Sequence, residues 1–178
     1  MITLVVLGAT NVVYARPPLK CNDGAFHAST ADSADPEYNV ECQILARAFC
    51  MVEEDRISGQ PASYAISRAS EWLSGLGRTG SHVKTNHRKQ VVPIADYVYA
   101  HDKMPPWTMY NYAVYTCGLN KRVASEKAKE SAVRWEAEAA ACIKESPGEG
   151  DGRSNQKLKD CLLAAMEAIA RETKATSK

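Results

Sequence analysis

Six cysteines constrain the fold of this chain more than any other feature of its sequence. They are Cys21, Cys42, Cys50, Cys117, Cys142 and Cys161, and all of them follow residue 20. No two form a Cys-x-x-Cys motif, so neither a zinc ribbon nor a thioredoxin-type redox site is indicated. An even number of cysteines is typical of an exported chain with disulfide bonds, here three. In a reducing cytosol the same residues would serve as small buried apolar side chains.

The positions of the cysteines favour one set of pairs. Cys42 and Cys50 lie on the same expected helix, about 12 Å apart along its axis, which is too far for a disulfide between them. Cys142 and Cys161 flank a loop between two helices and face inward. The favoured pairs are therefore Cys142 with Cys161, Cys42 with Cys117, and Cys21 with Cys50. An exchanged set, Cys21 with Cys42 and Cys50 with Cys117, remains open.

The first fifteen residues form an apolar run that ends in Val-Tyr-Ala. This pattern predicts a secretory signal peptide over residues 1–15, which would place the mature protein in the periplasm or outside the cell. The run is too short to span a bilayer. The alternative is a buried N-terminal strand, because the run is rich in β-branched residues.

The rest of the chain shows the spacing of amphipathic helices. Apolar residues recur every three or four positions within the ranges 37–57, 61–77, 91–100, 106–118, 123–144 and 155–171,. These ranges predict an all-α fold: a single compact domain of five to six helices that is stapled by disulfides. The last two helices are expected to form an antiparallel hairpin, with Ser154 or Asn155 capping the second of them.

Prolines and glycines suggest where the helices begin and end. Gly77 is a candidate left-handed cap for the second helix, and Gly118 is expected to end the fourth. Pro93 is expected to confine the start of the third helix to Val91 or Val92. The helix over 123–144 should be the longest. The expected organisation is an irregular arm over 16–36, one helical domain over 37–171 and a frayed tail over 172–178.

A basic segment separates the second and third helices. Residues 78–90 hold four basic side chains and two histidines, with Val83 as their one apolar residue. A partner with an acidic surface could bind here, and the candidate contacts are His82, Lys84, His87, Arg88 and Lys89. The alternative is an ordinary solvated connection. The histidines have no nearby carboxylate or thiolate in the sequence, so a metal site is not expected.

Aromatic residues cluster between residues 91 and 119. Trp107 and Tyr112, with Tyr97, would be contact residues for a partner if they formed an exposed patch. The favoured alternative is that these side chains pack against neighbouring helices and bring only their polar ends to the surface.

The sequence contains no recognisable catalytic motif. His101 and Asp102 are neighbours, and a hydrolase site assembled from distant residues could include them with Glu53. No nucleophile motif such as Gly-x-Ser-x-Gly accompanies them. No cofactor is expected.

Charge and composition point to recognition of another protein. The chain has 22 Lys and Arg against 21 Asp and Glu, a formal charge of +1, so it lacks the global field of a nucleic-acid-binding protein,. Its composition resembles that of small exported bacterial helical proteins, among them periplasmic immunity proteins. The resemblance implies a non-enzymatic, protein-binding module: an inhibitor, an immunity-type protein or an assembly factor. The alternatives are the hydrolase above and a structural component of an envelope complex.

Overall fold

The computed structural model describes residue 21 and residues 33–78, 87–123, 125–146 and 155–175. The expected signal peptide over 1–15 lies outside these residues, as do most of the arm over 16–36 and the side chains of His82 and Lys84. The described elements are all helical: η1 (Pro36–Tyr38), α1 (Val40–Ile57), α2 (Ala62–Arg78), α3 (His87–Ala100), α4 (Pro106–Arg122), η2 (Ser125–Lys127), α5 (Ala128–Glu145) and α6 (Gln156–Ala175). The prediction of an all-α fold with six main helices is confirmed.

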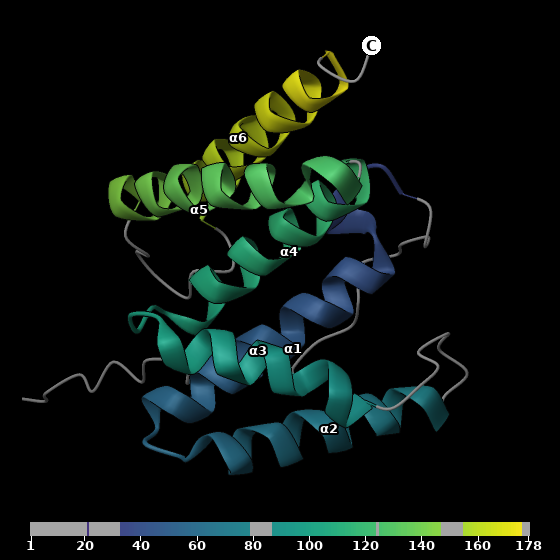
Figure 1. Ribbon diagram of the computed structural model, residues 1–178. Coiled ribbons are helices and arrows are strands. Elements are labelled where there is room, and N and C mark those ends of the chain that lie inside the picture. Colours follow the sequence, from purple (N-terminus) through teal and green to yellow (C-terminus); the bar gives the residue numbers. More distant parts are fainter. Residues whose placement is uncertain (1–20, 22–32, 79–86, 124, 147–154, 176–178) are drawn as a thin grey trace, which may run out of the picture.

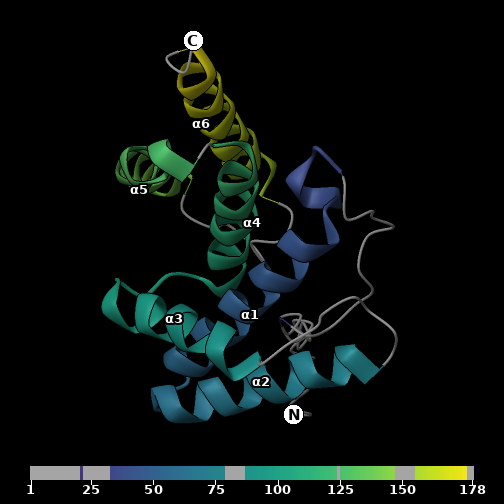
Figure 2. The same ribbon diagram turned by 45° about the vertical axis from the view of Figure 1, so that its right-hand side comes forward.

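Two central helices organise the fold. α1 and α4 form the most extensive helix pair, α2 and α3 pack on each other and on α1, and α6 packs on α4 and α5. In Figure 1, α2 lies below this central pair, α3 overlaps the lower half of α1, and α5 and α6 lie above. One hydrophobic core runs through both halves and contains side chains from all six α-helices. Figure 2 shows that α6 begins beside α4 and runs upward past its end, away from α2 and α3.

Three disulfides join parts of the chain that are distant in sequence. Cys21 bonds to Cys50, Cys42 to Cys117 and Cys142 to Cys161, with Cα atoms 5.6, 5.4 and 5.7 Å apart. These are the favoured pairs, and the exchanged set does not occur. The first ties the arm to α1, the second ties α1 to α4, and the third closes the α5–α6 hairpin.

The helix ends differ from the expected ones at the C-terminus. Asn155 caps α6, as expected, because its side-chain oxygen accepts a hydrogen bond from the backbone N–H of Leu158 at 3.0 Å,. α6 has 20 residues and is longer than α5, which has 18, so the expectation for the helix over 123–144 is wrong. α6 also continues to Ala175, which corrects the tail expected over 172–178 at its first four residues.

Three expectations based on proline and glycine are wrong as well. Pro93 lies inside α3, which already begins at His87. Its missing N–H would have bonded to the carbonyl of Lys89, and both residues are exposed, so water can take that carbonyl,. Gly77 and Gly118 lie within α2 and α4 and end neither helix.

Candidate functional site

The aromatic residues expected at a binding surface are buried. Trp107 is 5% exposed and packs with Met51 and the Cys21–Cys50 disulfide. Tyr112 is 6% exposed and stacks between Tyr97 and Trp135, with ring centroids 5.7 and 6.1 Å apart. The packing alternative therefore holds for both residues, and their assignment as exposed partner contacts is corrected.

Hydrogen bonds make this aromatic stack a joint between helices. The Tyr97 hydroxyl on α3 donates to the Tyr112 hydroxyl on α4 at 2.8 Å, and the Tyr112 hydroxyl lies 3.4 Å from Glu136 on α5. Burial raises the pKa of Tyr97 above its ordinary value, and the hydrogen bond to Tyr112 raises it further. The stack thus holds three helices together and leaves no reactive group free.

Only part of the basic segment falls within the described residues. Lys89 is exposed on the first turns of α3. His82 and Lys84 lie outside the described residues, and so do the side chains of His87 and Arg88. Partner binding by this segment stays a prediction.

Glu53, proposed as part of a hydrolase site, has a structural role. It is fully buried and forms an ion pair with Arg56 at 2.7 Å. Its Oε1 atom also accepts a hydrogen bond from the backbone N–H of Met104 at 2.8 Å. Arg56 in turn donates to the backbone carbonyls of His101 and Asp102. Glu53 and Arg56, here called the clamp, thus hold the connection between α3 and α4 in place. Both carboxylate oxygens of Glu53 accept hydrogen bonds from Arg56.

The side chain of His101 points to different partners. Its ring stacks on Tyr97 with centroids 3.9 Å apart, its Nδ1 lies 2.7 Å from the carbonyl of Tyr97, and its Nε2 lies 3.9 Å from Glu136. Arg56 therefore links Glu53 to the main-chain carbonyls of His101 and Asp102, and not to their side chains. Their side chains form no catalytic group with Glu53, because its carboxylate is saturated by the clamp.

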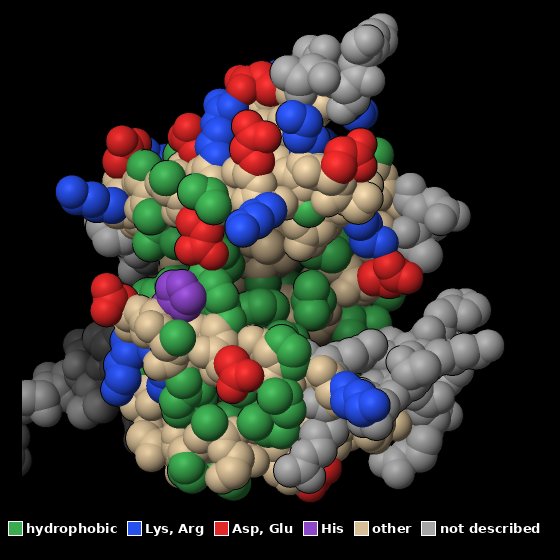
Figure 3. Space-filling model, viewed as in Figure 1, with side chains coloured by type: hydrophobic (Ala, Val, Ile, Leu, Met, Phe, Trp, Pro, Cys, Tyr) green, Lys and Arg blue, Asp and Glu red, His purple; other side chains and the backbone are tan. Residues whose placement is uncertain are grey.

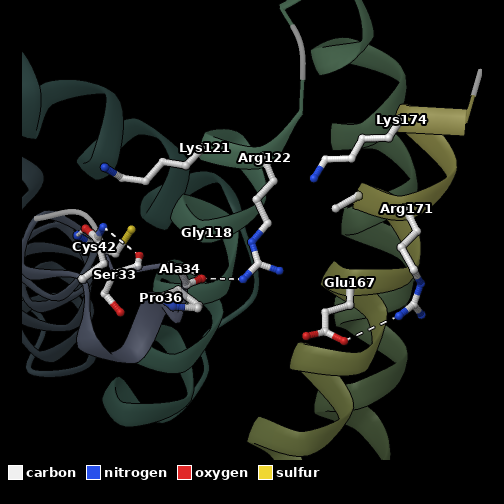
Figure 4. Close-up of a pocket in the computed structure, with 12 residues that line it drawn as sticks. Ser33, Ala34, Pro36, Cys42, Gly118, Lys121, Arg122, Glu167, Arg171 and Lys174 are labelled. Atoms are coloured by element: carbon white, nitrogen blue, oxygen red, sulfur yellow. Dashed lines mark hydrogen bonds and ion pairs between the residues drawn. The ribbon is translucent and has the colours of Figure 1, made fainter. Parts of the chain in front are cut away.

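A groove lies elsewhere, between the ends of α4 and α6. Its cavity volume is about 730 Å³. One wall is formed by residues 33–39, here called the strap, together with the last turn of α4, and the opposite wall is the C-terminal half of α6 (Figure 4). The lining residues are Ser33, Ala34, Pro36, Asn39, Cys42, Gly118, Lys121, Arg122, Glu167, Ala170, Arg171 and Lys174.

The strap is fastened to the helices by Glu37. The Tyr115 hydroxyl on α4 donates to one carboxylate oxygen of Glu37 at 2.6 Å, and Lys159 on α6 donates to the other at 3.1 Å. Gln43 on α1 donates to the Glu37 carbonyl at 2.8 Å. Burial and the neighbouring Glu37 carboxylate raise the pKa of Tyr115, so its hydroxyl keeps the proton that it donates. The strap thus forms a fixed wall.

Small residues form the floor of the groove. Gly118 is so close to the strap and to α6 that a Cβ atom there would lie 2.7 Å from the Cβ of Pro36 and 2.9 Å from the Sδ of Met166. Ala170 lines the α6 side and is 5% exposed. The floor is therefore apolar and tightly packed, and charge is confined to the rim.

Four cationic side chains line the groove against one carboxylate. Two of them are neutralised locally: Lys121 pairs with Glu41, and Arg171 lies 3.7 Å from Glu167. The other two have no such partner. Arg122 donates to the carbonyl of Ala34, which carries no net charge, and Lys174 forms no hydrogen bond or ion pair with any described residue.

These two cations lie on opposite walls. Figure 4 shows Lys174 extending from α6 towards α4, and Arg122 extending from α4 into the space between them. Cations in a last helical turn also stabilise the helix end, and this explains their position along α4 and α6 but not their approach across the groove. The surface of α5, by contrast, carries acidic and basic side chains close together (Figure 3).

Sequence reasoning missed this groove because its residues are scattered. They come from the strap, the end of α4 and the end of α6, in none of which basic residues form a conspicuous run. The only available signal was the basic residues in the last turns of α4 and α6. That pattern is common to many helices and does not indicate that two ends meet.

The described residues hold no candidate metal site and no candidate membrane-spanning helix. No group of three or more His, Cys, Asp or Glu side chains in the described residues could hold a metal ion. Among the described helices, none combines the length and apolarity needed to cross a membrane. No protein-family model, curated protein or solved structure matches the chain.

Proposed function

We propose that this protein is an exported, non-enzymatic binding protein that holds an acidic segment of another protein in the groove. Its three disulfides are compatible with an exported protein,. An inhibitor, an immunity-type protein or an assembly factor would all work in this way. The observation that carries the proposal is the pair of cations, Arg122 and Lys174, on opposite walls of the groove, for which no carboxylate among the described residues forms an ion pair.

The charges of the groove favour an anionic ligand, and its volume favours a ligand much larger than a single ion. Two cations on opposite walls of a groove repel each other, and negative charge brought between the walls relieves that repulsion. The volume of about 730 Å³ lies within the range of pockets that hold whole ligands,. Since water occupies about 30 Å³ per molecule in the liquid, the groove is much larger than a site for one small ion.

The test is reversal of one charge. Lys174→Glu changes a side chain without a described partner, so the fold should persist with only a small loss of stability at the end of α6,. We expect its affinity for a peptide rich in Asp and Glu to fall about fivefold to tenfold at low salt, because one favourable contact becomes repulsive. Titration calorimetry or fluorescence anisotropy with a labelled peptide measures the change.

A matched control carries the same change of charge at a distant place. Lys144 is exposed at the end of α5 that lies beside the start of α6, across the Cys142–Cys161 disulfide, whereas Lys174 lies in the last turn of α6. Lys144→Glu should bind the peptide as the parent protein does. Equal losses in both variants would show that only net charge matters, and unchanged binding by Lys174→Glu would remove the groove as the site.

A third variant compares the groove with the basic segment. Lys84→Glu combined with Arg88→Glu reverses two charges in the segment that the sequence favours for partner binding. If the segment is the contact, this variant loses the peptide and Lys174→Glu keeps it. The groove proposal predicts the opposite order of affinities.

A further inference from the structure

We propose that the occupant of the groove is an extended peptide segment with two neighbouring acidic residues, one directed to each wall. This inference rests on the proposed function and names the form of the ligand. It starts from the placement of the two cations that form no ion pair with a described carboxylate: Arg122 projects from the α4 wall and Lys174 from the α6 wall. An occupant that satisfies both must present negative charge on two opposite sides.

An extended chain has this property because successive side chains point to opposite sides of the backbone. Acidic residues at positions i and i+1 would therefore meet the two walls separately. Acidic residues at i and i+2 point to the same side and leave one cation without a partner. An acidic helix has a larger diameter, about 10 Å with side chains, and its successive side chains point about 100° apart around the axis rather than to opposite sides.

The floor of the groove fits a backbone that passes over it. Pro36, Gly118 and Ala170 present small, apolar surfaces between the charged rims. A lipid headgroup or an inorganic anion concentrates its charge at one point, whereas the cations are divided between two walls. This division of charge favours the peptide over an anionic membrane or free phosphate.

The experiment uses the full protein and two peptides of identical composition. Both are acetylated and amidated, so that they carry no terminal charges, and both hold two acidic residues in a Gly/Ser background. In one peptide the acidic residues are neighbours, and in the other a serine separates them. The measured quantity is the ratio of the two dissociation constants at low salt.

We expect the peptide with neighbouring acidic residues to bind roughly threefold to fivefold more tightly, which is the size of one additional exposed ion pair. In Lys174→Gln, one wall is neutral and the ratio should fall to about one, since both peptides then make one charged contact. A ratio depends on spacing and not on the amount of folded protein, so partial unfolding of the variant would not produce this result.

Three outcomes would overturn the inference. The first is equal binding of the two peptides by the parent protein, in which case charge alone decides and the proposed function survives. The second is a ratio that persists in Lys174→Gln. The third is stronger, Lys174-dependent binding of phosphatidylglycerol vesicles or inorganic phosphate. If neither peptide binds at all, the proposed function fails together with the inference.

Discussion

At the scale of single residues, the chemistry of this protein is mainly structural. Glu53, His101 and Asp102 come together in the fold, but Arg56 occupies the Glu53 carboxylate and contacts only the main-chain carbonyls of His101 and Asp102. The sequence does not predict that these residues lie close together, because any residue type can supply the main-chain carbonyls that Arg56 binds. A buried ion pair that is also saturated by backbone groups is a stable arrangement, and removal of either partner would strand the other.

The buried tyrosines predict a loss of stability at alkaline pH. An unfolded tyrosine loses its proton near its ordinary pKa of 10.0, whereas folded Tyr97 holds its proton to higher pH because of burial and the hydrogen bond to Tyr112. Its contribution to stability is present below pH 10 and is lost as the pH rises above that value, by at most about 1.4 kcal/mol per pH unit for one group.

Tyr97→Phe should therefore make the alkaline decline of stability shallower, while near neutral pH it lowers the free energy of unfolding by about 1 kcal/mol through the lost hydrogen bond. Urea denaturation at a series of pH values above and below 10 measures both effects. Tyr64, which is 49% exposed on α2, provides the control: Tyr64→Phe should keep the parent slope. An unaltered slope in Tyr97→Phe would contradict the assigned shift in pKa.

At the scale of helices, the buried faces follow from the sequence, but the ends do not. The buried residues Val91, Ile94, Ala95 and Val98 repeat at helical spacing in α3, and the face was predicted correctly. The start of α3 was predicted wrongly, because Pro93 was expected to lie in the first turn of the helix. Its missing hydrogen bond lies on the exposed side of α3, so the helix can continue through it,. Local rules for proline describe an isolated helix better than one packed against two others.

Gly118 shows the same limit of local rules. It does not end α4, and its missing side chain instead lets Pro36 and Met166 pack close to the helix. Gly118→Ala would improve helix propensity by about 1 kcal/mol, yet the added carbon would meet Pro36 and Met166 at 2.7 and 2.9 Å. We expect the second effect to win and the free energy of unfolding to fall by up to about 2 kcal/mol, because overpacking typically costs about 1–3 kcal/mol. Urea denaturation measures the change.

Gly75 on α2 is the matched control, because a Cβ atom added there meets nothing within 4 Å. Gly75→Ala should raise the free energy of unfolding by up to about 1 kcal/mol. If both variants gain stability, the strap is free to move away from α4, and the description of a tightly packed floor is wrong.

At the scale of the whole molecule, the three disulfides differ in the length of chain that they close. Cys42–Cys117 spans 75 positions and joins the two central helices, whereas Cys142–Cys161 spans 19 and closes a hairpin. The chain-entropy relation gives a stabilisation of about 4.5 kcal/mol for the first and about 3.3 kcal/mol for the second. The central bond should therefore matter more.

Paired Cys→Ala variants test this order. Cys42→Ala with Cys117→Ala should lose about 1 kcal/mol more stability than Cys142→Ala with Cys161→Ala, as measured by urea denaturation without reductant. Each variant removes two sulfur atoms, but Cys161 is only partly buried, whereas Cys42, Cys117 and Cys142 are buried. A greater loss from the hairpin pair would show that its bond stabilises the folded hairpin directly, and not mainly through the unfolded chain.

The disulfide pairs could be predicted in part: Cys142–Cys161 followed from the hairpin, while the other two pairs were favoured over an exchanged set that stayed open. Cys42 and Cys117 both repeat with inward apolar residues, and Cys142 and Cys161 are brought together by one short connection. The groove lacked any such signal. It depends on Pro36 resting on Gly118 and on α6 passing the end of α4, which are long-range contacts that periodicity within a single helix does not encode.

The way in which Glu37 fastens the strap sets how a partner would arrive. Tyr115 and Lys159 hold one side chain from two helices, so the wall is already in place in the free protein. The entropy of ordering the site is then lost during folding, and only the incoming segment must become ordered on contact. For a rigid, charged receptor of this kind, the electric field at the rim speeds association, and the association rate constant falls as salt is added. Partners that fit the groove differently would differ chiefly in their dissociation rate constants.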